Sequence, residues 1–452
     1  MSKVMIIGAT GGVGSVVTQK CSRSETISEI VGVNTNPQKY GELNKLLEEP
    51  IDGRSVDVSD FDQIHGLIKE TKPDLVLHIG LPYHNLIIME ACYQAGVCYL
   101  DTANYEPEWD HHLRYDEQWE FFEKFRSRAI TALLGSGFDP GVTNVFCAYA
   151  LKNYFREIHT IDIMDCNGGD HGKAFASNFN LVVNLCEFLF NRYCYWQNGR
   201  WVVHMPLWSP KAIHQTFDFD GIGSREMYAI FHEEMDSLRL YIPGVKRMRF
   251  WMTFGKSYLE HLRMFMDLGL ASIQKWRPAC SEISPRSFLE MLLHDTRTIR
   301  AKIKKYQHLL EPIGMLSEKP IKLDEGKTIS PLEFLQKVLP APSSLGENYT
   351  GKTNIGVRFE GISKSGNPMK YYIYNICDHH DDAYVDCKAQ AVSYTTGVPA
   401  MVGAEMILQG KWQGRGVFHP EQFDPDPFMY ELGHWGLPYI QKFDDEVPDL
   451  KF

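Results

Sequence analysis

The chain begins with an apolar run that leads into a glycine-rich turn. Residues 4–9 are continuously apolar, which is typical of a strand buried inside a parallel sheet. Residues 11–23 then have the composition of a helix. A strand, a glycine turn and a helix in this order favour an open α/β sheet that binds a pyrophosphate at the helix N-terminus. We therefore predict dinucleotide contacts at Gly8, Thr10, Gly11, Gly12, Val13 and Gly14. The alternative is a tight turn that binds nothing.

Strand and helix patterns alternate along the first third of the chain. Further strands are predicted at residues 29–33, 54–58, 74–80, 97–100 and 130–134, and helices at 61–70, 85–95 and 115–128. Six strands with helices between them predict an α/β fold built on a Rossmann-type doubly wound parallel sheet.

The pattern changes after about residue 156, where residues 158–164 and 370–376 alternate like antiparallel strands. The small-residue helix at 398–408 suits packing on the first sheet. We predict a Rossmann domain at 1–155, an inserted α+β substrate and dimerisation domain at 156–389, and a return to the first domain at 390–452. Residues 273–330 are charged and helical, and part of this stretch is interpreted as an insertion.

Composition restricts the function classes. The net charge of −11 disfavours a nucleic-acid partner, because phosphate binding needs clustered Lys and Arg. No apolar stretch approaches the ~20 residues that cross a bilayer, so we expect no membrane partner. The ten cysteines form no C-x-x-C pair and fit a reducing cytoplasm.

The segment after the second strand bears on the choice of cofactor. It contains Asn34, Thr35, Asn36 and Lys39 but no carboxylate for the ribose hydroxyls of NAD, so it favours NADP. The alternative is an NAD enzyme that uses neutral side chains. Loop positions after later strands complete the predicted cofactor site: Asp57, Val58, Gly80, Leu81, Pro82, Asp101, Thr102 and Asn104.

Several longer blocks resemble the saccharopine dehydrogenase family, and within it the carboxynorspermidine dehydrogenase branch. The blocks include residues 99–107 (YLDTANYEP), 135–141 (GSGFDPG), 173–180 (KAFASNFN), 393–400 (SYTTGVPA) and 423–428 (FDPDPF). They extend from end to end of the chain. Ser136 departs from the pattern, where Cys is expected, and the insertion at 273–330 is longer than the family needs.

This resemblance implies reductive condensation in polyamine biosynthesis. L-Aspartate β-semialdehyde and a diamine, either 1,3-diaminopropane or putrescine, would form an imine that NADPH reduces to carboxynorspermidine or carboxyspermidine. It also implies a homodimer. Two alternatives are a saccharopine dehydrogenase-like imine reductase for another amino acid and amine, and a non-catalytic NADP-binding protein.

Such a reaction needs proton transfer, an anionic group for the remote ammonium and a hydrogen-bonding group for the carboxylate. Candidate catalytic residues are Asp139, Lys173 and Tyr394. Candidate substrate-binding residues are Tyr105, Glu106, Phe138, Asn167, Asn178, Asn180, Arg249 and Thr395.

Each of these candidates has a structural alternative. Asp139 could cap a helix with Pro140 at its first position, and Lys173 could lie in a solvated loop. Tyr394 and Thr395 could pack between the domains, and Arg249 could form an ion pair on a strand face. The run of acids and histidines at 378–382 suggests a metal, but adjacent histidines in a strand point apart, so we predict a solvated loop and no metal.

Overall fold

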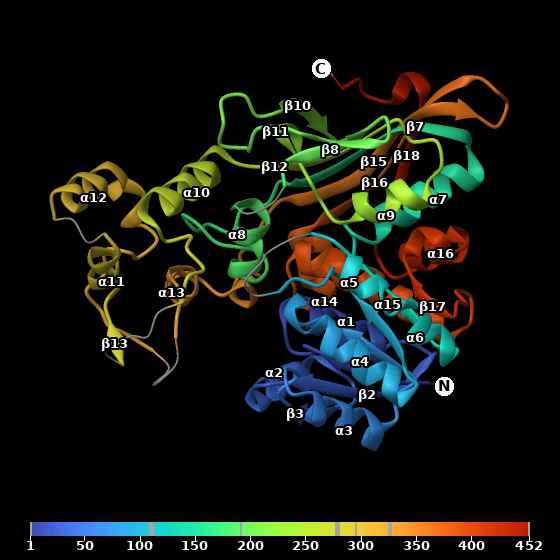
Figure 1. Ribbon diagram of the computed structural model, residues 1–452, viewed down its shortest axis with the longest axis horizontal. Helices are drawn as coiled ribbons and strands as arrows, with labels where there is room; N and C mark the ends of the chain where they lie inside the picture. The colour runs from blue at the N-terminus through green and yellow to red at the C-terminus, as the bar shows by residue number, and fades with distance from the viewer. Residues whose placement is uncertain are drawn as a thin grey trace.

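The computed structural model describes residues 2–107, 113–189, 192–275, 281–293, 296–323 and 328–450. Figure 1 shows two sheets, one above the other, with a helical lobe extending to one side. The lower sheet is built mainly from the first third of the chain.

The lower sheet confirms the predicted α/β class. Its seven strands are parallel and run in the order β17-β6-β5-β4-β1-β2-β3. These are β1 (Ser2–Ile7), β2 (Ile27–Asn34), β3 (Asp52–Ser55), β4 (Leu75–His78), β5 (Cys98–Asp101), β6 (Thr131–Leu133) and β17 (Gly416–Phe418). Parallel strands in a sheet covered on both faces are buried throughout, which explains the continuous apolar runs.

Helices cover both faces of this sheet. On one face α1 (Gly12–Ser22) and α15 (Ala391–Leu408) pack against Val4, Ile6, Leu75 and Leu77. On the other face α3 (Phe61–Thr71) and α4 (Asn85–Ala95) pack against Met5, Ile7 and Val76. The shorter α5 (Asp116–Trp119) and α6 (Phe122–Ser127) continue this second layer. Alternate residues of each strand therefore supply the two cores.

The upper sheet is mixed and contains nine strands. Its main path is β10-β11-β12-β7-β15-β16-β18, and β8 pairs with β12 and β9. The strands are β7 (Phe155–Asn167), β8 (Cys194–Gln197), β9 (Arg200–Val203), β10 (His214–Phe219), β11 (Gly223–Ile230), β12 (Arg247–Thr253), β15 (Lys352–Ser363), β16 (Pro368–Asp378) and β18 (Tyr439–Phe443). One face packs on α7 (Val142–Asn153) and α9 (Glu234–Tyr241).

The C-terminal segment visits both sheets. Helix α15 and strand β17 rejoin the lower sheet, and α16 (Pro425–His434) packs on α15. The chain then leaves again, because β18 pairs with β16 in register from Tyr371↔Phe443 to Asn375↔Tyr439. The last described residues thus belong to the upper sheet, in contrast to the expected return over the whole of 390–452.

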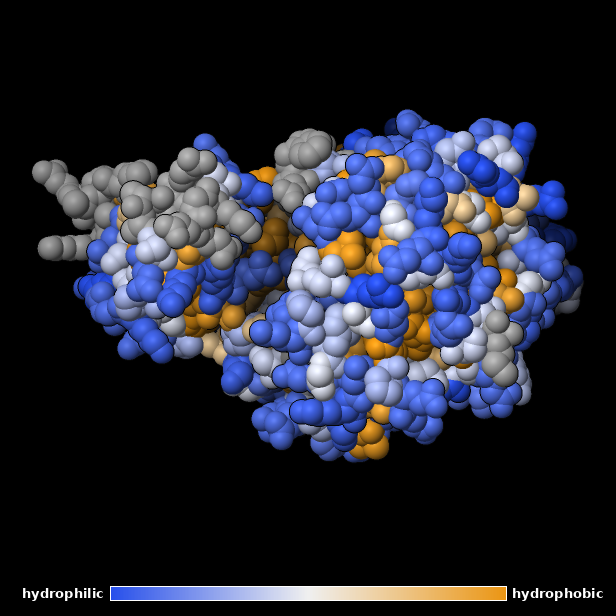
Figure 2. Space-filling model, turned by 90° about the horizontal axis from the view of Figure 1, so that it is seen from below, coloured by the Kyte–Doolittle hydropathy of each residue, from blue (hydrophilic) through white to orange (hydrophobic). Residues whose placement is uncertain are grey.

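The lobe corresponds to the charged, helical stretch noticed in the sequence. It contains α10 (Lys256–Leu268), α11 (Pro285–Leu292), α12 (Thr296–Leu310), α13 (Pro331–Val338) and the two-stranded ribbon of β13 (Glu282–Ile283) and β14 (Ile321–Lys322). It joins the body through α8 (Leu181–Leu189), where the Tyr258 hydroxyl donates to Asn184 Oδ1 at 2.8 Å. Figure 2 shows a groove between lobe and body with hydrophobic residues along it.

Candidate active site

The glycine turn after β1 is built for close backbone approach. Gly8 has φ +84°, and a Cβ placed there would lie 2.8 Å from the Ile79 carbonyl oxygen of the turn after β4. A Cβ on Gly14 would lie 2.0 Å from the Gly8 carbonyl oxygen. The glycines therefore bring the carboxyl ends of β1 and β4 together, where an open α/β sheet binds its ligand.

The N-terminus of α1 faces this turn. Gly11 is its N-cap, and no side chain in the described ranges caps the helix there. Free N–H groups and the helix dipole favour an anion at such a position. Gly12 also lies against the start of α15, since a Cβ there would be 2.9 Å from Ser393 Oγ.

The segment after β2 lies beside the glycine turn. Asn34 donates a hydrogen bond to the Thr10 hydroxyl, and Asn34 Oδ1 accepts from the Asn36 N–H at 3.2 Å. Thr35 and Asn36 are exposed. Asp57 is exposed after β3, with Oδ1 accepting from the Ser59 hydroxyl at 2.6 Å. These side chains lie after the carboxyl ends of β2 and β3, and their contact with an adenosine group remains a prediction.

The turns after β4 and β5 complete this edge. Gly80 is exposed, Leu81 is half-buried and Pro82 begins a short helical turn leading into α4. His78, at the end of β4, is buried, and burial lowers the pKa of its imidazole to about 3. Thr102 is half-buried, and its carbonyl oxygen would lie 3.6 Å from a Cβ on Gly137.

Asp101 binds neighbouring elements and not the open edge. Its carboxylate accepts from the Gly135 N–H at 2.8 Å, from Gln118 Nε2 at 2.7 Å and from the Tyr99 hydroxyl at 3.0 Å. The predicted cofactor contact of this side chain is therefore replaced by a structural role. Asn104 is similarly buried, and its amide donates to the Tyr105 and Arg114 carbonyl oxygens.

Asp139 lies in a tight turn after β6. The Gly137 N–H donates to the Pro140 carbonyl at 2.9 Å, and Gly141 has φ +132° with no room for a Cβ, which would be 2.1 Å from the Gly137 carbonyl oxygen. Gly141 is the N-cap of α7, so Asp139 is not the helix cap. The Asp139 carboxyl lies close enough to Asp165 of β7 and to His232 for both to act on it electrostatically.

Acidic residues from β7, from α8 and from the segment after β11 surround Asp139. We call this group the acidic cluster, and its members are Asp139, Asp165, Glu187, Glu233 and Glu234, grouped around His232. The His232 Nδ1 contacts Glu234 and lies 3.7 Å from Glu233 Oε2, and Nε2 lies 3.4 Å from Glu187 Oε1. The imidazole also stacks on Phe250, with ring centroids 4.2 Å apart.

Burial controls the charges in this cluster. Burial and the neighbouring Asp165 raise the pKa of Asp139 well above its usual value. Burial also raises the pKa of Asp165 to about 7 and that of Glu233 to about 8. Burial opposes charge on His232, but Glu234 and Glu233 outweigh it and raise its pKa well above normal. The site can therefore hold a neutral, proton-donating carboxyl beside an imidazolium.

Comparison with known proteins identifies the family. Residues 4–133 match the saccharopine dehydrogenase NADP binding domain, and residues 137–437 match the saccharopine dehydrogenase C-terminal domain. The chain belongs to the saccharopine dehydrogenase family. It is thus an NAD(P)-dependent oxidoreductase, and the resemblance inferred from the sequence blocks is confirmed.

Relatives align along the whole chain. A carboxyaminopropylagmatine dehydrogenase from Synechocystis sp. is 40% identical over 449 residues and covers 99% of both chains. Carboxynorspermidine synthase from Vibrio alginolyticus is 37% identical and covers 98% of both chains, and that from Vibrio cholerae is 36% identical and covers 99% of both.

Two solved structures share the fold. Saccharopine dehydrogenase from Saccharomyces cerevisiae superimposes with a TM-score of 0.71 at 14% identity, covering 98% of this chain and 100% of that one. Homospermidine synthase from Legionella pneumophila gives 0.59 at 13% identity and covers 98% and 92%. In the described part of this family member, no helix is long and apolar enough to span a membrane.

Most of the acidic cluster was missed by sequence reasoning. Of its members only Asp139 was a candidate. Glu187 comes from α8, whereas His232, Glu233 and Glu234 follow β11. The available signal was the run His-Glu-Glu directly after a buried strand, where three ionisable residues must share a partly buried position.

A second buried histidine lies in a neutral cluster, which we define as His379, Tyr349, Asn167 and Asn178. His379 Nδ1 accepts from the Ala391 N–H at 3.0 Å, and its Nε2 lies 3.3 Å from Asn167 Oδ1. Tyr349 stacks on the imidazole at 3.8 Å, and its hydroxyl donates to Asn178 Oδ1 at 2.9 Å. The prediction of a solvated loop is wrong for His379, which is fully buried.

Tyr394 lies away from the predicted cleft. Its hydroxyl donates to Asp386 Oδ2 at 2.7 Å, and Lys20 Nζ lies 3.1 Å from it in the same buried network. Lys20 also donates to the Trp435 carbonyl at 2.7 Å. The predicted catalytic role is corrected to the structural alternative, since the hydroxyl ties α1 and α15 to the segment after α16.

Other substrate candidates also have structural partners. Asn180 Oδ1 accepts from the Val182 and Val183 N–H groups, so it caps the start of α8. Phe138 is buried in the core against Phe146 at 6.3 Å, and Thr395 is buried within α15. These burials replace the predicted substrate contacts by packing and capping.

Lys173 and Arg249 are also displaced from the acidic cluster. Lys173 is exposed, which agrees with the alternative of a solvated loop. Arg249 contacts Tyr195 and Trp251 on the opposite face of the upper sheet from Phe250, and Arg247 on that face pairs with Asp162 at 3.0 Å. By contrast Tyr105 and Glu106 lie in the loop after β5, and Glu106 acts electrostatically on Glu233.

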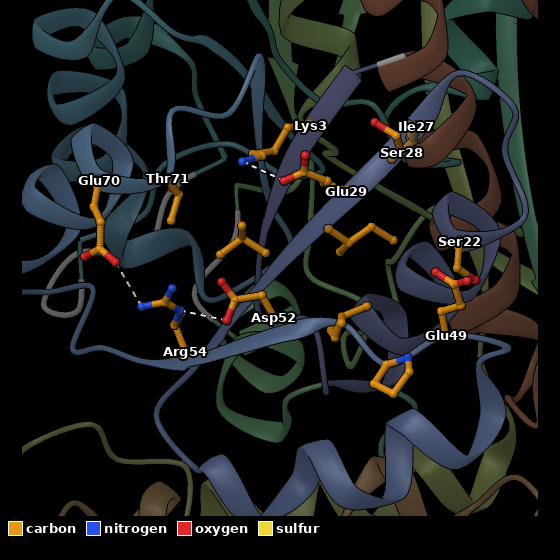
Figure 3. Close-up of a pocket in the computed structure, with 14 residues that line it drawn as sticks. Lys3, Ser22, Ile27, Ser28, Glu29, Glu49, Asp52, Arg54, Glu70 and Thr71 are labelled. Atoms are coloured by element: carbon orange, nitrogen blue, oxygen red, sulfur yellow. Dashed lines mark hydrogen bonds and ion pairs between the residues drawn. The ribbon is translucent and has the colours of Figure 1, made fainter.

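The cavity in Figure 3 lies at the other end of the first sheet. It has a volume of about 420 Å³ and is lined by residues at the starts of β1, β2 and β3, including Lys3, Ile27 and Asp52. Both of its cations are already paired, Lys3 with Glu29 at 2.6 Å and Arg54 with Asp52 at 2.8 Å. Because ligands of open α/β sheets bind at the carboxyl ends of the strands, we do not assign the cofactor to this cavity.

Proposed function

We propose that the chain catalyses the NADPH-dependent reductive condensation of L-aspartate β-semialdehyde with a diamine. The products would be carboxynorspermidine from 1,3-diaminopropane and carboxyspermidine from putrescine, which are reactions of polyamine biosynthesis. The observation that carries the proposal is the partly buried Asp139 carboxyl, which follows β6 at the predicted cofactor edge and belongs to the acidic cluster. Full-length similarity to the carboxynorspermidine synthases supports it.

The residues divide the chemistry between the two sheets. When bound at the glycine turn, the nicotinamide cofactor supplies the hydride that reduces the imine. Asp139, whose pKa is raised by burial and by the neighbouring Asp165, would donate the proton that expels water as the imine forms. Thr102 and Gly137 lie close together in the turns that precede this carboxyl, at the predicted cofactor edge.

The preference for NADP is part of the proposal. The segment Asn34 to Asn36 offers amide and hydroxyl groups where an NAD enzyme commonly has a carboxylate, and the exposed Lys39 follows it. A cation and neutral donors suit a 2′-phosphate, whereas a carboxylate would repel it.

Agmatine is a second candidate for the amine. The relative from Synechocystis sp. is named carboxyaminopropylagmatine dehydrogenase and is 40% identical, against 37% for the synthase from Vibrio alginolyticus. A guanidinium and an ammonium can both pair with carboxylates, so the acidic cluster suits either.

The test is NADPH oxidation with aspartate β-semialdehyde and, separately, 1,3-diaminopropane, putrescine or agmatine. Oxidation that requires one of these amines supports the proposal and names the product. Parallel assays with NADH test the cofactor preference. Oxidation only with lysine and 2-oxoglutarate would indicate a saccharopine dehydrogenase reaction and overturn the proposal.

A further inference from the structure

The acidic cluster contains more acidic groups than its own cation can balance. Five carboxyl groups meet around one imidazolium, and within the described ranges the ion pairs of Glu187, Glu233 and Glu234 are all with His232. His232, Glu233 and Glu234 are each at most 6% exposed. A buried excess of carboxylates is unfavourable unless a further cation enters or the groups take up protons.

Glu187 is the member that is open to such a cation. Its side chain is 9% exposed, and Oε1 is buried without a hydrogen-bond donor of suitable geometry among the described residues. The nearest positive group is His232 Nε2 at 3.4 Å. A buried carboxylate oxygen with unused acceptor capacity indicates a missing donor.

We propose that the acidic cluster binds the second positive charge of the amine substrate and that Glu187 contacts this charge directly. The inference rests on the proposed function and specifies its amine as one that carries a cation at the far end. That cation can be the ammonium of a diamine or the guanidinium of agmatine, because both are multiple donors to carboxylates.

The geometry gives the amine a direction. Asp139 belongs both to the turn after β6 at the cofactor edge and to the acidic cluster, whereas Glu187 approaches from α8 of the upper part. An amine whose far cation lies at Glu187 therefore points its reacting nitrogen toward Asp139 and the cofactor edge. Fixing one end in this way lowers the entropy cost of bringing the other end to reaction distance.

Binding of the cation should also release protons. Asp165 and Glu233 have pKa values of about 7 and about 8 because they are buried, so both are partly protonated near neutral pH. Glu106 and Glu421 add negative charge near Glu233 and Glu234, and Tyr193 and Tyr258 face Glu187. A cation stabilises the carboxylate forms, lowers these pKa values and expels protons.

The experiment compares putrescine with butylamine, which has the same carbon chain but lacks the far cation. In wild type we expect putrescine to be the better substrate in kcat/KM by at least about 30-fold, the scale of one buried charge pair. Glu187→Gln should remove most of this preference through the KM for putrescine, while the KM for aspartate β-semialdehyde stays unchanged. Glu260→Gln, on the exposed face of α10, is the matched control.

Calorimetry separates this inference from the proposed function. Putrescine and agmatine are each titrated into wild type, Glu187→Gln and Glu260→Gln, in two buffers with different ionisation enthalpies. Wild-type binding with proton release, weakened only in Glu187→Gln, supports the inference even if no amine is turned over, and the preferred probe identifies the cation. Equal affinity of wild type and Glu187→Gln for both probes, or an unchanged preference over butylamine, would overturn it.

Discussion

Two buried histidines of this oxidoreductase lie in opposite electrostatic environments. His232 is surrounded by carboxyl groups, with Glu234 in contact and Glu187 at 3.4 Å. His379 lies among neutral groups, with Tyr349 stacked at 3.8 Å and the Ala391 N–H donating to Nδ1. The pKa of His232 is raised well above its usual value, whereas burial lowers that of His379 to about 4.

The difference shows that burial alone does not set the charge of a histidine. Both rings are nearly inaccessible to water, which by itself favours the neutral form. Carboxylates reverse this preference at His232, and a backbone N–H that occupies the Nδ1 lone pair reinforces it at His379. We therefore assign charge chemistry to the acidic cluster and orientation of loops to the neutral cluster.

The largest expected effect is at the carboxyl that joins the acidic cluster to the cofactor edge. Asp139→Asn should lower kcat by ~10²–10⁴-fold, because the amide cannot transfer the proton. Steady-state kinetics measure this, and NADPH affinity should remain unchanged. Asp218→Asn, at an exposed position of β10, is the control. An unchanged kcat in Asp139→Asn would show that the acidic cluster takes no part in the proton transfer.

The next effect is on stability. His232→Gln removes the imidazolium and leaves buried carboxylates unbalanced, so the free energy of unfolding should fall by about 3–5 kcal/mol at neutral pH. The matched control is His214→Gln, which breaks an exposed pair with Glu226 at 2.7 Å and should cost at most about 1 kcal/mol. Denaturant unfolding measures both. Equal losses would contradict the assignment of a buried, charged His232.

A smaller loss is expected in the neutral cluster. His379→Gln should lower the free energy of unfolding by about 1–3 kcal/mol, through the lost ring stack and the disturbed hydrogen bonds to Ala391 and Asn167. Its effect on kcat should be far below that of Asp139→Asn. A loss of activity as large as that of Asp139→Asn would show that the two clusters are not divided as we propose.

The smallest expected effect is the contribution of His379 to the pH dependence of the free energy of unfolding. The pKa of His379 is about 4 in the folded chain and about 6.5 in the unfolded chain. Between pH 6.5 and pH 4 the imidazole is therefore protonated in the unfolded chain and neutral in the folded chain, which favours unfolding. Acidification from pH 7 to pH 5 should therefore cost wild type about 1–2 kcal/mol at this residue. His379→Gln should lack this part of the loss in unfolding experiments. If the free energy of unfolding fell equally with pH in wild type and in His379→Gln, a neutral His379 would be refuted.

The cofactor half of the site could be predicted because its signals are local. The strand, glycine turn and helix at residues 4–23 are contiguous, and Gly8 and Gly14 make close approaches that Cβ atoms would prevent. The helix at Asn85–Ala95 has the predicted bounds, and Gly96 ends it with φ +74°. Backbone conformation of this kind depends on residues near in sequence.

The substrate half could be predicted only in part. Asp139 could be named as a candidate because it follows a strand of the first sheet. Tyr394 and Arg249 looked equally suitable as polar candidates, but partners far away in sequence engage them: Lys20 contacts the Tyr394 hydroxyl, and Tyr195 packs against Arg249. Whether a polar side chain is free for a ligand depends on those distant partners.

The sequence by itself determined the class of sheet, the cofactor edge and the family, because periodicity, glycine spacing and contiguous blocks are properties of the chain order. Only the tertiary structure decided that Asp139, Asp165, Glu187 and the His232 segment meet, since they come from the turn after β6, from β7, from α8 and from the segment after β11. It also decided their charges, because a pKa depends on burial and on neighbours in space and not on the residue type alone.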